Sequence, residues 1–264
     1  STLKGFEIIN NKDDYLHTLI ESYRIFASDR DNITYDYQGN DQKFLGTDDQ
    51  YIREKVSLFD KNASGKYNFP NPHGGGTAYM NAVDENGLGI SLIQSNFYGI
   101  GSRIGVGSYG FFLHNRGCGF NLIEGHPNSL GPNKKPLHTL SPTIWSKDGS
   151  LDFITGTRGG RYQPQLLAQT ILPYILGESS FEEIIEKPRW TIDYFRSNTS
   201  SNVKFEFLNE PEISRLEEKG HEISIENKLV GAYGPISTIY KNFDKKFIGV
   251  SDIRVGTEKA FNNS

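Results

Sequence analysis

The sequence lacks the marks of several protein classes. It contains a single cysteine, Cys118, in 264 residues, which excludes an internal disulfide framework and gives no cysteine-rich metal cluster. No stretch approaches the roughly 18 consecutive apolar residues that a membrane-spanning helix needs. The first residues also lack the apolar core of a secretory signal, which favours the cytoplasm if the chain begins at its natural start. We therefore expect a soluble globular protein that depends on neither disulfides nor a membrane.

A strong charge of one sign is also absent. The chain has 32 acidic and 28 basic residues, for a formal net charge of −4. It has no polybasic run or basic helix, so nucleic acid and anionic membranes are poor candidates for partners. Small molecules or peptides are better candidates. The length allows one large domain or two small ones.

Common catalytic motifs are missing as well. The six histidines form no metal-binding pair at helical spacing, and the zinc motif HExxH, the phosphate loop GxxxxGK and the esterase elbow GxSxG do not occur. GVGSYG at 105–110 matches the dinucleotide fingerprint, but a glycine loop enters it and a strand-like segment leaves it, whereas the fingerprint needs an entering strand and a leaving helix. The sequence thus favours neither a zinc or serine hydrolase nor a dinucleotide site, and a loop near a site is the better interpretation of GVGSYG.

The apolar periodicity predicts an α+β fold. Helices are expected at 12–28, 48–58, 163–176, 180–187 and 211–220. Strands are expected at 77–83, 88–95, 111–115, 142–146, 151–156, 203–207, 221–225, 237–243 and 245–252. The first hairpin is apolar on both faces, which predicts a sheet that is covered on each side. Strand pairs without a regular strand–helix alternation favour mainly antiparallel sheets.

The stretch NPHGGGTAYMN at 71–81 places three glycines directly before a threonine that opens a predicted strand. A threonine hydroxyl is a weak nucleophile unless a base lies beside it, and the residue's own α-amino group, with a pKa of about 8, is such a base. That amine exists only if the peptide bond between Gly76 and Thr77 is cut. Glycines before the bond allow the strained backbone geometry that brings the hydroxyl onto the preceding carbonyl. Self-cleavage is one interpretation of the stretch, and a flexible turn is the other.

Several further stretches share the order and spacing of a known family. They are TAYMNAVDENGLGISLIQSN, GFFLHNRGCGFNL, GPNKKPLHTLSPTIWSKDG and ITGTRGGRYQPQ. In this order they resemble the small subunit of γ-glutamyltransferases, which are N-terminal nucleophile hydrolases. IESYRIFASDRD resembles a helix late in that family's large subunit, and EKPRW and GVSDIR resemble its closing motifs. Each motif alone is weak, but their common order over nearly the whole chain is specific.

The resemblance implies the four-layer αββα sandwich with mainly antiparallel sheets. It also implies processing between Gly76 and Thr77, so that residues 1–76 are the C-terminal end of the large subunit with its processing loop, and residues 77–264 are the small, catalytic subunit. A full family member carries a long segment ahead of residue 1, with part of the sheet and an arginine for the substrate carboxylate. We therefore expect this large-subunit segment as a missing partner. The resemblance implies no metal or organic cofactor.

Positions that match the family give expected catalytic roles. Thr77 is the family nucleophile, and Ser95 stands for the hydroxyl residue that hydrogen-bonds and orients it. Gly159 and Gly160 match the pair whose backbone amides form the oxyanion hole, where small residues let the substrate approach the main chain. A turn before the following helix is the alternative for these glycines, and both can be true.

The chain departs from the family pattern where transpeptidases hold the γ-glutamyl amino group. Arg116 stands where they have Glu or Gln, and Gly119 where they have Asp. An arginine cannot neutralise an ammonium group but favours a carboxylate, which it can bind bidentately. The alternative for Arg116 is a surface or structural ion pair.

Three other expected substrate contacts also differ from the family. His138 and Thr139 replace two serines that grip the α-carboxylate, and both can still donate hydrogen bonds. A substrate-contacting asparagine aligns with Phe97, and Asn96 lies one place earlier. Because neighbours on a strand point to opposite faces unless the backbone twists, Asn96 replaces that asparagine only if the strand is irregular there.

These departures resemble the acylase-like branch of the family, alongside enzymes that cleave glutaryl or polyglutamyl amides. We therefore expect hydrolysis of γ-glutamyl or related acyl amides of small molecules or peptides to prevail over transfer to dipeptides. The alternative from another class is an inactive or binding-only homologue or fragment that keeps the family fold. The sequence leaves the natural substrate and the oligomeric state open.

Overall fold

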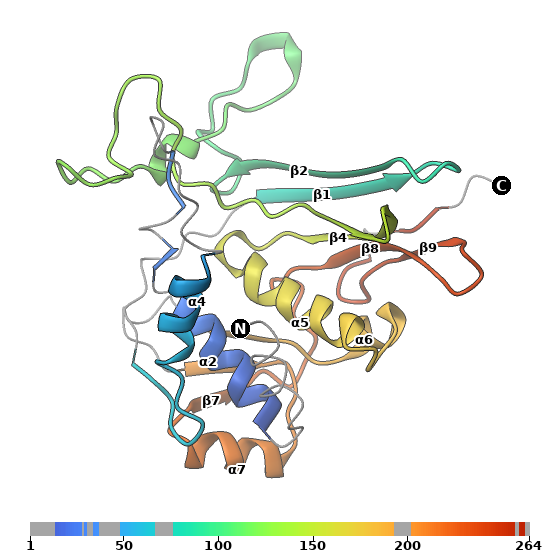
Figure 1. The fold of residues 1–264 in the computed structure, drawn as a ribbon. Coiled ribbons are helices and arrows are strands. Elements are labelled where there is room, and N and C mark those ends of the chain that lie inside the picture. Colours follow the sequence, from blue (N-terminus) through green and yellow to red (C-terminus); the bar gives the residue numbers. More distant parts are fainter. Residues whose placement is uncertain are drawn as a thin grey trace.

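The computed structural model arranges the chain as three sheets with covering helices. It describes residues 14–27, 29–30, 34–36, 48–66, 76–192, 202–256 and 259–261. In Figure 1 a two-stranded sheet lies over a four-stranded one, helices cover the opposite face of the latter, and the three-stranded sheet lies below with helices of its own. Within the described residues, no helix is long and apolar enough to cross a membrane.

The first sheet is a hairpin of two antiparallel strands. These are β1 (Gly76–Val83) and β2 (Gly89–Phe97). Asp84 holds the turn between them, because its Oδ1 accepts the backbone N–H groups of Asn86 and Leu88 at 2.9 and 2.8 Å. Along β1 the odd-numbered residues are partly buried and the even-numbered ones are exposed, as in a strand with one covered face.

The second sheet has the order β3-β4-β8-β9 and is antiparallel throughout. Its strands are β3 (Thr143–Lys147), β4 (Ser150–Thr157), β8 (Ile236–Lys241) and β9 (Phe247–Val250). The face turned away from the hairpin is covered by α5 (Gln163–Ile175) and α6 (Phe181–Glu186) (Figure 1). Between the sheet and these helices lies an apolar core of Phe153, Leu167, Ile171, Phe181 and Ile184.

The third sheet carries the N-terminal helix. Its strands are β5 (Trp190–Ile192), β6 (Asn202–Phe205) and β7 (Glu222–Ile225), and α7 (Glu210–Glu218) connects the parallel pair β6 and β7. The helix α2 (Tyr15–Ala27) packs on this unit through a buried cluster of Leu19, Ile20, Trp190, Ile192, Val203, Phe205 and Leu216. The shorter helix α4 (Asp49–Val56) contacts α2 and begins at Asp48, whose side chain accepts two backbone N–H groups.

The hairpin lies close on the second sheet because glycines leave room for it. A Cβ atom on Gly156 of β4 would lie 2.2 Å from the ring of Tyr79 of β1. At the other end, a Cβ on Gly89 would lie 2.5 Å from Ile154. Asn81 also donates to the carbonyl oxygen of Ser237 in β8 at 3.1 Å. The covered face of the hairpin therefore packs directly on β4 and β8.

The outer face of the hairpin is apolar and exposed. The exposed fractions of Met80, Ile90 and Leu92 are 48, 58 and 49%. The sequence predicts a hairpin that is covered on both faces, but in the part of the chain that the structure describes no element lies over this one (Figure 1). The described layers are thus the two stacked sheets and one outer layer of helices.

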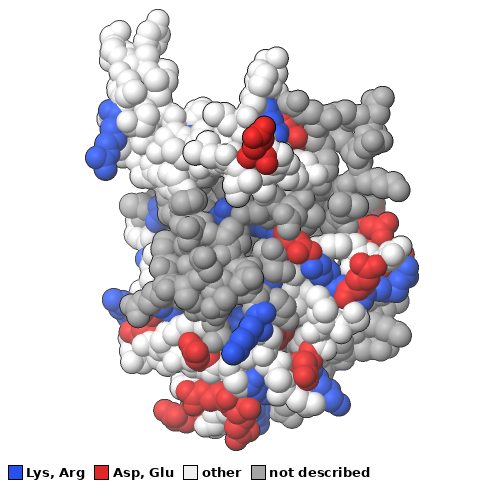
Figure 2. Space-filling view, turned by 90° about the vertical axis from the view of Figure 1, so that its left-hand side faces the viewer, with Lys and Arg blue, Asp and Glu red and all other residues white. Residues whose placement is uncertain are grey.

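Most of the predicted elements are confirmed, but the strand at 111–115 is wrong. Residues 102–113 form an irregular hairpin with one isolated bridge, between Gly105 and Phe112, and backbone hydrogen bonds between its two arms. This loop and the loop 121–131 project from the molecule (Figure 1), and Figure 2 shows two projections of mostly uncharged side chains at the same end. The apolar composition fits a strand, but glycines with positive φ, Gly107 and Gly110, turn the chain back before it reaches a sheet.

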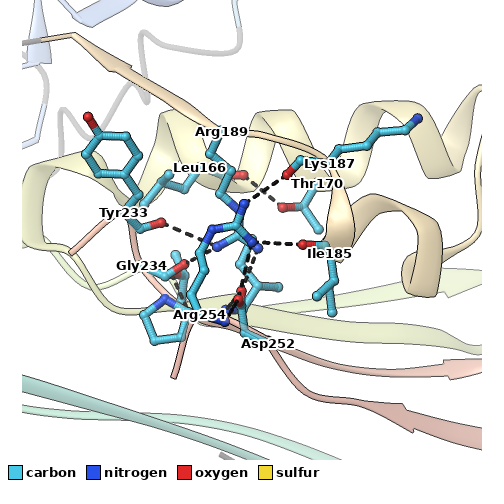
Figure 3. A network of polar contacts seen from close by, with 12 residues as sticks. Leu166, Thr170, Ile185, Lys187, Arg189, Tyr233, Gly234, Asp252 and Arg254 are labelled. Carbon is cyan, nitrogen blue, oxygen red and sulfur yellow. Dashed lines mark hydrogen bonds and ion pairs between the residues drawn. The ribbon is translucent and has the colours of Figure 1, made fainter. Parts of the chain in front are cut away.

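A network of buried charges holds the end of the chain against the second sheet (Figure 3). Arg254 pairs with Glu206 and Asp252 and also donates to two carbonyl oxygens at the end of α6. Arg189 donates to Asp252 Oδ2 at 2.5 Å and to the carbonyl oxygen of Gly234 at 2.7 Å. Because each buried cation meets a carboxylate, neither sign of charge is left uncompensated.

A second buried polar group lies between α2 and the start of β7. His17 Nδ1 lies 2.8 Å from His221 Nε2, Arg24 Nη1 lies 3.1 Å from His221 Nδ1, and His17 Nε2 lies 2.8 Å from the carbonyl oxygen of Asp60. An arginine only donates, so His221 Nδ1 must accept and its Nε2–H must donate to His17. His17 then donates its own Nε2–H to Asp60. The hydrogen bonds therefore require both imidazoles to be neutral.

The same region holds the loop 60–65 in place. Glu21, which is buried beside Arg24, accepts the backbone N–H of Gly65 at 2.8 Å. Ser64 donates its backbone N–H to the carbonyl oxygen of Lys219 at 2.6 Å. The loop is thus tied both to α2 and to the end of α7.

We expect the protein to lose stability in acid because His221 is buried in its neutral form. Burial, followed by the nearby charge of Arg24, lowers the pKa of His221 to about 3, against about 6.5 in the unfolded chain. Since the unfolded state binds the proton first, the free energy of unfolding should fall by about 1.4 kcal/mol per pH unit from pH 6.5 towards 3. Urea unfolding at several pH values measures this slope. His221→Gln should reduce this slope by about 1.4 kcal/mol per pH unit, which corresponds to one proton. The substitution of an exposed histidine, His114→Gln, should leave the slope unchanged. Equal slopes in wild type and His221→Gln would contradict the assignment.

Candidate active site

The first residues of β1 pair irregularly with β2. Gly76 lies opposite Phe97 and Thr77 opposite Ser95, so Asn96 is an extra residue that forms a bulge. A Cβ atom on Gly76 would lie 2.1 Å from the carbonyl oxygen of Gly99. Only a glycine therefore fits before Thr77 without a shift of the backbone. The predicted roles of Gly74 and Gly75 lie outside the described residues.

The hydroxyl groups of Thr77 and Ser95 meet across the hairpin. Thr77 Oγ1 donates to Ser95 Oγ at 2.9 Å, and Ser95 Oγ donates to the carbonyl oxygen of Gly76 at 3.1 Å. The backbone N–H of Phe97 donates to Ser95 Oγ at 3.1 Å and fixes its position. Ser95 thus contacts both the hydroxyl oxygen and the carbonyl group of the Gly76–Thr77 peptide bond, which is the geometry that a proton relay between them needs.

The glycine pair lies at the same end of the stacked sheets as Thr77. Gly89 of the hairpin lies against Ile154 of β4, and Tyr79 lies against Gly156. Thr77 is two residues beyond Tyr79 on the same face of β1, in the direction in which β4 runs towards its end. β4 continues in that direction into Gly159 and Gly160, which have φ of 129° and 56° and precede α5. Positive φ at both positions explains the choice of glycine. The topology therefore brings Thr77 towards this turn.

Arg116 lies beside the bulge. It begins the turn η4 (Arg116–Gly119), and its guanidinium lies 4.6 Å from the ring centre of Phe97. Its Nη1 donates to Thr139 Oγ1 at 3.1 Å, whereas its buried Nη2 has no hydrogen-bond partner among the described residues. Burial lowers the pKa of Arg116. Arg116 therefore forms no ion pair with a carboxylate in the described part of the chain. The ion pair was the alternative interpretation of this residue.

Phe97 is a buried apolar residue at the position where the family pattern has a substrate-contacting asparagine. It is 6% exposed and has a φ of 76°, which is rare for a bulky residue. A Cβ atom on Gly119 would lie 3.6 Å from the Phe97 ring, so the ring occupies the side of Gly119. The irregularity that Asn96 needs is present, and among the described residues its carbonyl oxygen accepts the backbone N–H of Asn115 at 3.1 Å.

Two asparagines that the sequence analysis did not single out hold these segments together. Asn128 is buried, donates to the carbonyl oxygen of Gly119 at 2.7 Å and accepts the backbone N–H of Leu137 at 3.0 Å. Asn115 accepts the backbone N–H of Tyr98 at 2.9 Å. Asn128 lies outside the family-like stretches, and Asn115 lies within GFFLHNRGCGFNL beside Arg116 without an expected role of its own, so the positioning role of both is visible only in the fold.

His138 connects this region to a cavity of about 760 Å³. Partial burial, then the Arg116 charge, lowers the pKa of His138, so its imidazole is neutral near pH 7. The cavity is lined by Tyr23, Phe26, Ala27, Arg30, Thr34, Tyr35, Asp36, Lys135, Pro136, His138, Leu140, Ser141 and Pro164. Thr77 is not among them, so the cavity adjoins the candidate catalytic groups through His138 rather than enclosing them. No three His, Cys, Asp or Glu residues in the described ranges gather as a metal site.

Comparisons with known proteins agree with these features. A family model described as gamma-glutamyltranspeptidase matches residues 1–261. The oxamate amidohydrolase proenzyme of Klebsiella pneumoniae is 33% identical over 189 residues, which cover 69% of this chain and 36% of that protein. The glutathione hydrolase-like YwrD proenzyme of Bacillus subtilis is 29% identical over 237 residues, which cover 87% of this chain and 43% of that protein. The chain thus spans less than half the length of these relatives.

Solved structures share the fold. The cephalosporin acylase from Bacillus halodurans superposes with a TM-score of 0.77 at 24% identity, over 92% of this chain and 44% of that one. A gamma-glutamyltranspeptidase mutant from Pseudomonas nitroreducens gives 0.59 at 20% identity, over 70% of this chain and 99% of that one. The predicted α+β fold with mainly antiparallel sheets is therefore confirmed, and of the αββα sandwich of N-terminal nucleophile hydrolases the described residues form the two stacked sheets and one outer layer of helices.

Gly76→Ala should destabilise the protein, because the added methyl group meets the backbone carbonyl oxygen of Gly99 in the turn after β2, and the backbone must shift to make room. We expect a loss of about 1–3 kcal/mol in the free energy of unfolding, as is typical of overpacking. Gly131→Ala is the matched control, since its Cβ would find only the Lys134 side chain at 3.8 Å. Urea unfolding compares the two, and equal midpoints would show that the close approach to Gly99 is not a constraint.

Proposed function

The chain belongs to the gamma-glutamyltranspeptidase family, and we propose that it is a threonine hydrolase that cuts itself between Gly76 and Thr77 and then cleaves γ-glutamyl or related acyl amides. The observation that carries this proposal is the contact of Ser95 with both Thr77 Oγ1 and the Gly76 carbonyl oxygen. The same contact serves the cut and the later turnover, because both begin with the Thr77 hydroxyl. The relatives named proenzymes support it.

In the first stage Thr77 Oγ adds to the Gly76 carbonyl carbon. Its proton passes to Ser95, and Ser95 gives its own proton to the carbonyl oxygen. The C–N bond then breaks as this proton moves on to the Thr77 nitrogen and the C=O bond re-forms, so that Gly76 is held by an ester and the Thr77 amine is free. Water opens the ester and restores the hydroxyl. Residues 1–76 and 77–264 become separate chains, the end of the large subunit and the small subunit.

In the second stage the freed amine of Thr77 is the general base. It takes the proton of the Thr77 hydroxyl as Oγ attacks the amide carbonyl of the substrate, and the backbone amides of Gly159 and Gly160 stabilise the oxyanion. The amine half leaves with a proton, and water releases the acyl group from Thr77. The residues present supply every step, so the proposal needs no cofactor.

The environment of Arg116 supports an acyl group that carries a carboxylate. Its Nη2 has no hydrogen-bond partner among the described residues and would gain one by binding a carboxylate oxygen, with the Thr139 hydroxyl as a neighbouring donor. Phe97 and Gly119 leave no acidic group to hold a γ-glutamyl ammonium. We therefore propose that hydrolysis of such amides prevails over transfer to dipeptides, with Asn96 as an additional contact from the bulge.

A further segment completes the molecule in this proposal. The exposed Met80, Ile90 and Leu92 form an apolar face on β1 and β2, and the relatives are more than twice as long as the matched part. A preceding large-subunit segment fits this face because stacked sheets in this fold are covered on both outer sides. The alternative is a binding-only homologue, and its support is the change of the residues that hold the substrate ammonium group in the family. This alternative does not explain the hydrogen bonds among Thr77, Ser95 and Gly76.

The nucleophile assignment predicts the fate of the full-length protein. The wild type should yield a fragment that begins at Thr77, whereas Thr77→Ala should stay in one piece and Thr77→Ser, which keeps a hydroxyl, should still be cut. Mass spectrometry measures the fragments, and Thr143→Ala is a control threonine outside the site. Cleavage of Thr77→Ala at the same bond would refute the assignment. An intact wild type without a free threonine amine would favour the binding-only alternative.

The acyl preference depends on Arg116. Wild type should hydrolyse glutaryl anilides better than γ-glutamyl anilides, and Arg116→Ala should lower the ratio of their kcat/KM values by about tenfold, as expected for the loss of a charge-assisted contact. Arg116→Lys keeps the charge but not the planar fork and should fall between. Arg103→Ala, in the projecting loop, should keep the ratio. An unchanged ratio in Arg116→Ala would remove the argument for a carboxylate contact.

A further inference from the structure

Two glutamines at the start of α5 are completely buried. Gln163 and Gln165 are both 0% exposed, and a buried amide lowers stability unless its polar atoms form hydrogen bonds. Gln165 Oε1 accepts the backbone N–H of Ile192 at 3.1 Å and so joins α5 to β5 of the third sheet. Gln163 forms a different connection, which the mechanism above does not use.

Gln163 joins the segment before β3 to the Gly159–Gly160 turn. Its Oε1 accepts the backbone N–H of Ser141 at 2.8 Å. Because a backbone N–H only donates, this contact fixes the orientation of the amide. The backbone N–H of Gln163 donates to the carbonyl oxygen of Gly160. One residue therefore holds Ser141 with its side chain and the glycine turn with its main chain.

This connection lies just beyond the end of a strand pairing. The described pairing of β3 with β4 begins at Thr143, which lies opposite Thr155. The residue before Thr143 is Pro142, which has no N–H group to extend the ladder. The hydrogen bond from Ser141 to Gln163 follows directly after this break. The spacing between Ser141 and the glycine turn thus depends on a side chain.

The two segments that Gln163 joins are proposed to hold opposite ends of the acyl group. Thr139, two residues before Ser141, accepts a hydrogen bond at 3.1 Å from Arg116, the proposed contact of the acyl carboxylate. The glycine turn is the proposed oxyanion site of the reacting carbonyl. The chain length of an acyl group fixes the distance between its two ends, so the spacing of the two segments must match that distance.

Half of the Gln163 amide has no partner. Its Nε2 is buried and forms no hydrogen bond with the described residues. A buried donor without a partner is unfavourable, and a methionine would fill a similar volume without this donor. Packing alone therefore does not explain a glutamine at this position, and the hydrogen bond with Ser141 is what its amide adds.

We propose that Gln163 is a positioning residue for amides whose acyl group carries a carboxylate. It sets the spacing between the glycine turn and the segment of Thr139, so that an acyl group of glutaryl length meets both the turn and Arg116. This inference rests on the proposed function, because it assigns a role within that site. Gln163 acts through the two segments and not by contact with the substrate.

Two 4-nitroanilides test this role in the full-length protein. The glutaryl and butyryl compounds have the same acyl chain except for the terminal carboxylate, so only the first uses the segment of Thr139. Gln163→Met should lower the ratio of their kcat/KM values, glutaryl over butyryl, by about tenfold, because a shift of this segment misplaces only the carboxylate. A purely structural role would lower both values together and leave the ratio unchanged.

Matched variants complete the test. Gln163→Asn, whose oxygen is one methylene too short for Ser141, should lower the ratio as Gln163→Met does. Gln163→Glu keeps an acceptor oxygen at the same place and should retain the ratio. Gln165→Met removes an equally buried amide from the same helix and should match wild type. A wild-type ratio near one, an unchanged ratio in Gln163→Met and Gln163→Asn, or an equal fall in Gln165→Met would overturn the proposal.

Binding of the free acids separates this proposal from the hydrolase proposal, because it needs no turnover. Calorimetry should show that glutarate binds wild type more tightly than butyrate does, and that Gln163→Met removes most of this difference. If this holds while neither anilide is cleaved, the role of Gln163 in acyl binding stands and the hydrolase proposal fails. If the anilides are cleaved but Gln163→Met changes neither the ratio nor the difference in binding, the hydrolase proposal stands and the positioning role falls.

Discussion

The contact of Tyr79 with Gly156 is the constraint on which the candidate site depends. Because β4 has no side chain at this position, the hairpin lies close enough for its first residues to face the turn after β4. Any larger residue would meet the Tyr79 ring and push β1 away from β4 at this end, which carries Thr77. The geometry of the proposed nucleophile and oxyanion donors thus depends on a position without a side chain, three residues before Gly159 in β4 and in contact with the strand of Thr77.

Buried polar contacts then fix the remaining sides of the site. Arg189 holds the carbonyl oxygen of Gly234, and a Cβ atom on Gly234 would lie 2.3 Å from the Arg158 carbonyl oxygen. The charge network of Figure 3 therefore fixes Gly234, whose backbone lies close against the residue that precedes the glycine pair. On the opposite side Asn128 ties the turn of Arg116 to the segment of Thr139. The site rests on several independent supports rather than on one element.

The sequence predicts the elements better than the contacts. Period-two and helical patterns locate the hairpin, the helices and the strands after 142, because apolar periodicity follows directly from which face is buried. The predicted strand at 111–115 is wrong because an apolar composition is common to a strand and to the apolar arm of a loop. The pairs His17–His221 and Arg189–Asp252 join residues 204 and 63 positions apart, which no local pattern signals. Thr77, Ser95 and the glycine pair are found by family likeness, whereas the bulge at Asn96 and the ring of Phe97 under Arg116 need the fold.

The anchoring of α2 and the loop 60–65 has a consequence for the lifetime of the cut protein. α2 shares its apolar core with β5 and β6, and the loop is bound to Glu21 and Lys219 well before Gly76. Cleavage before Thr77 would therefore break one covalent link between two parts that other contacts already join. These contacts are the apolar core of α2 with β5 and β6 and the hydrogen bond of the loop 60–65 to Lys219. The two polypeptides would therefore stay associated after the cut and unfold together.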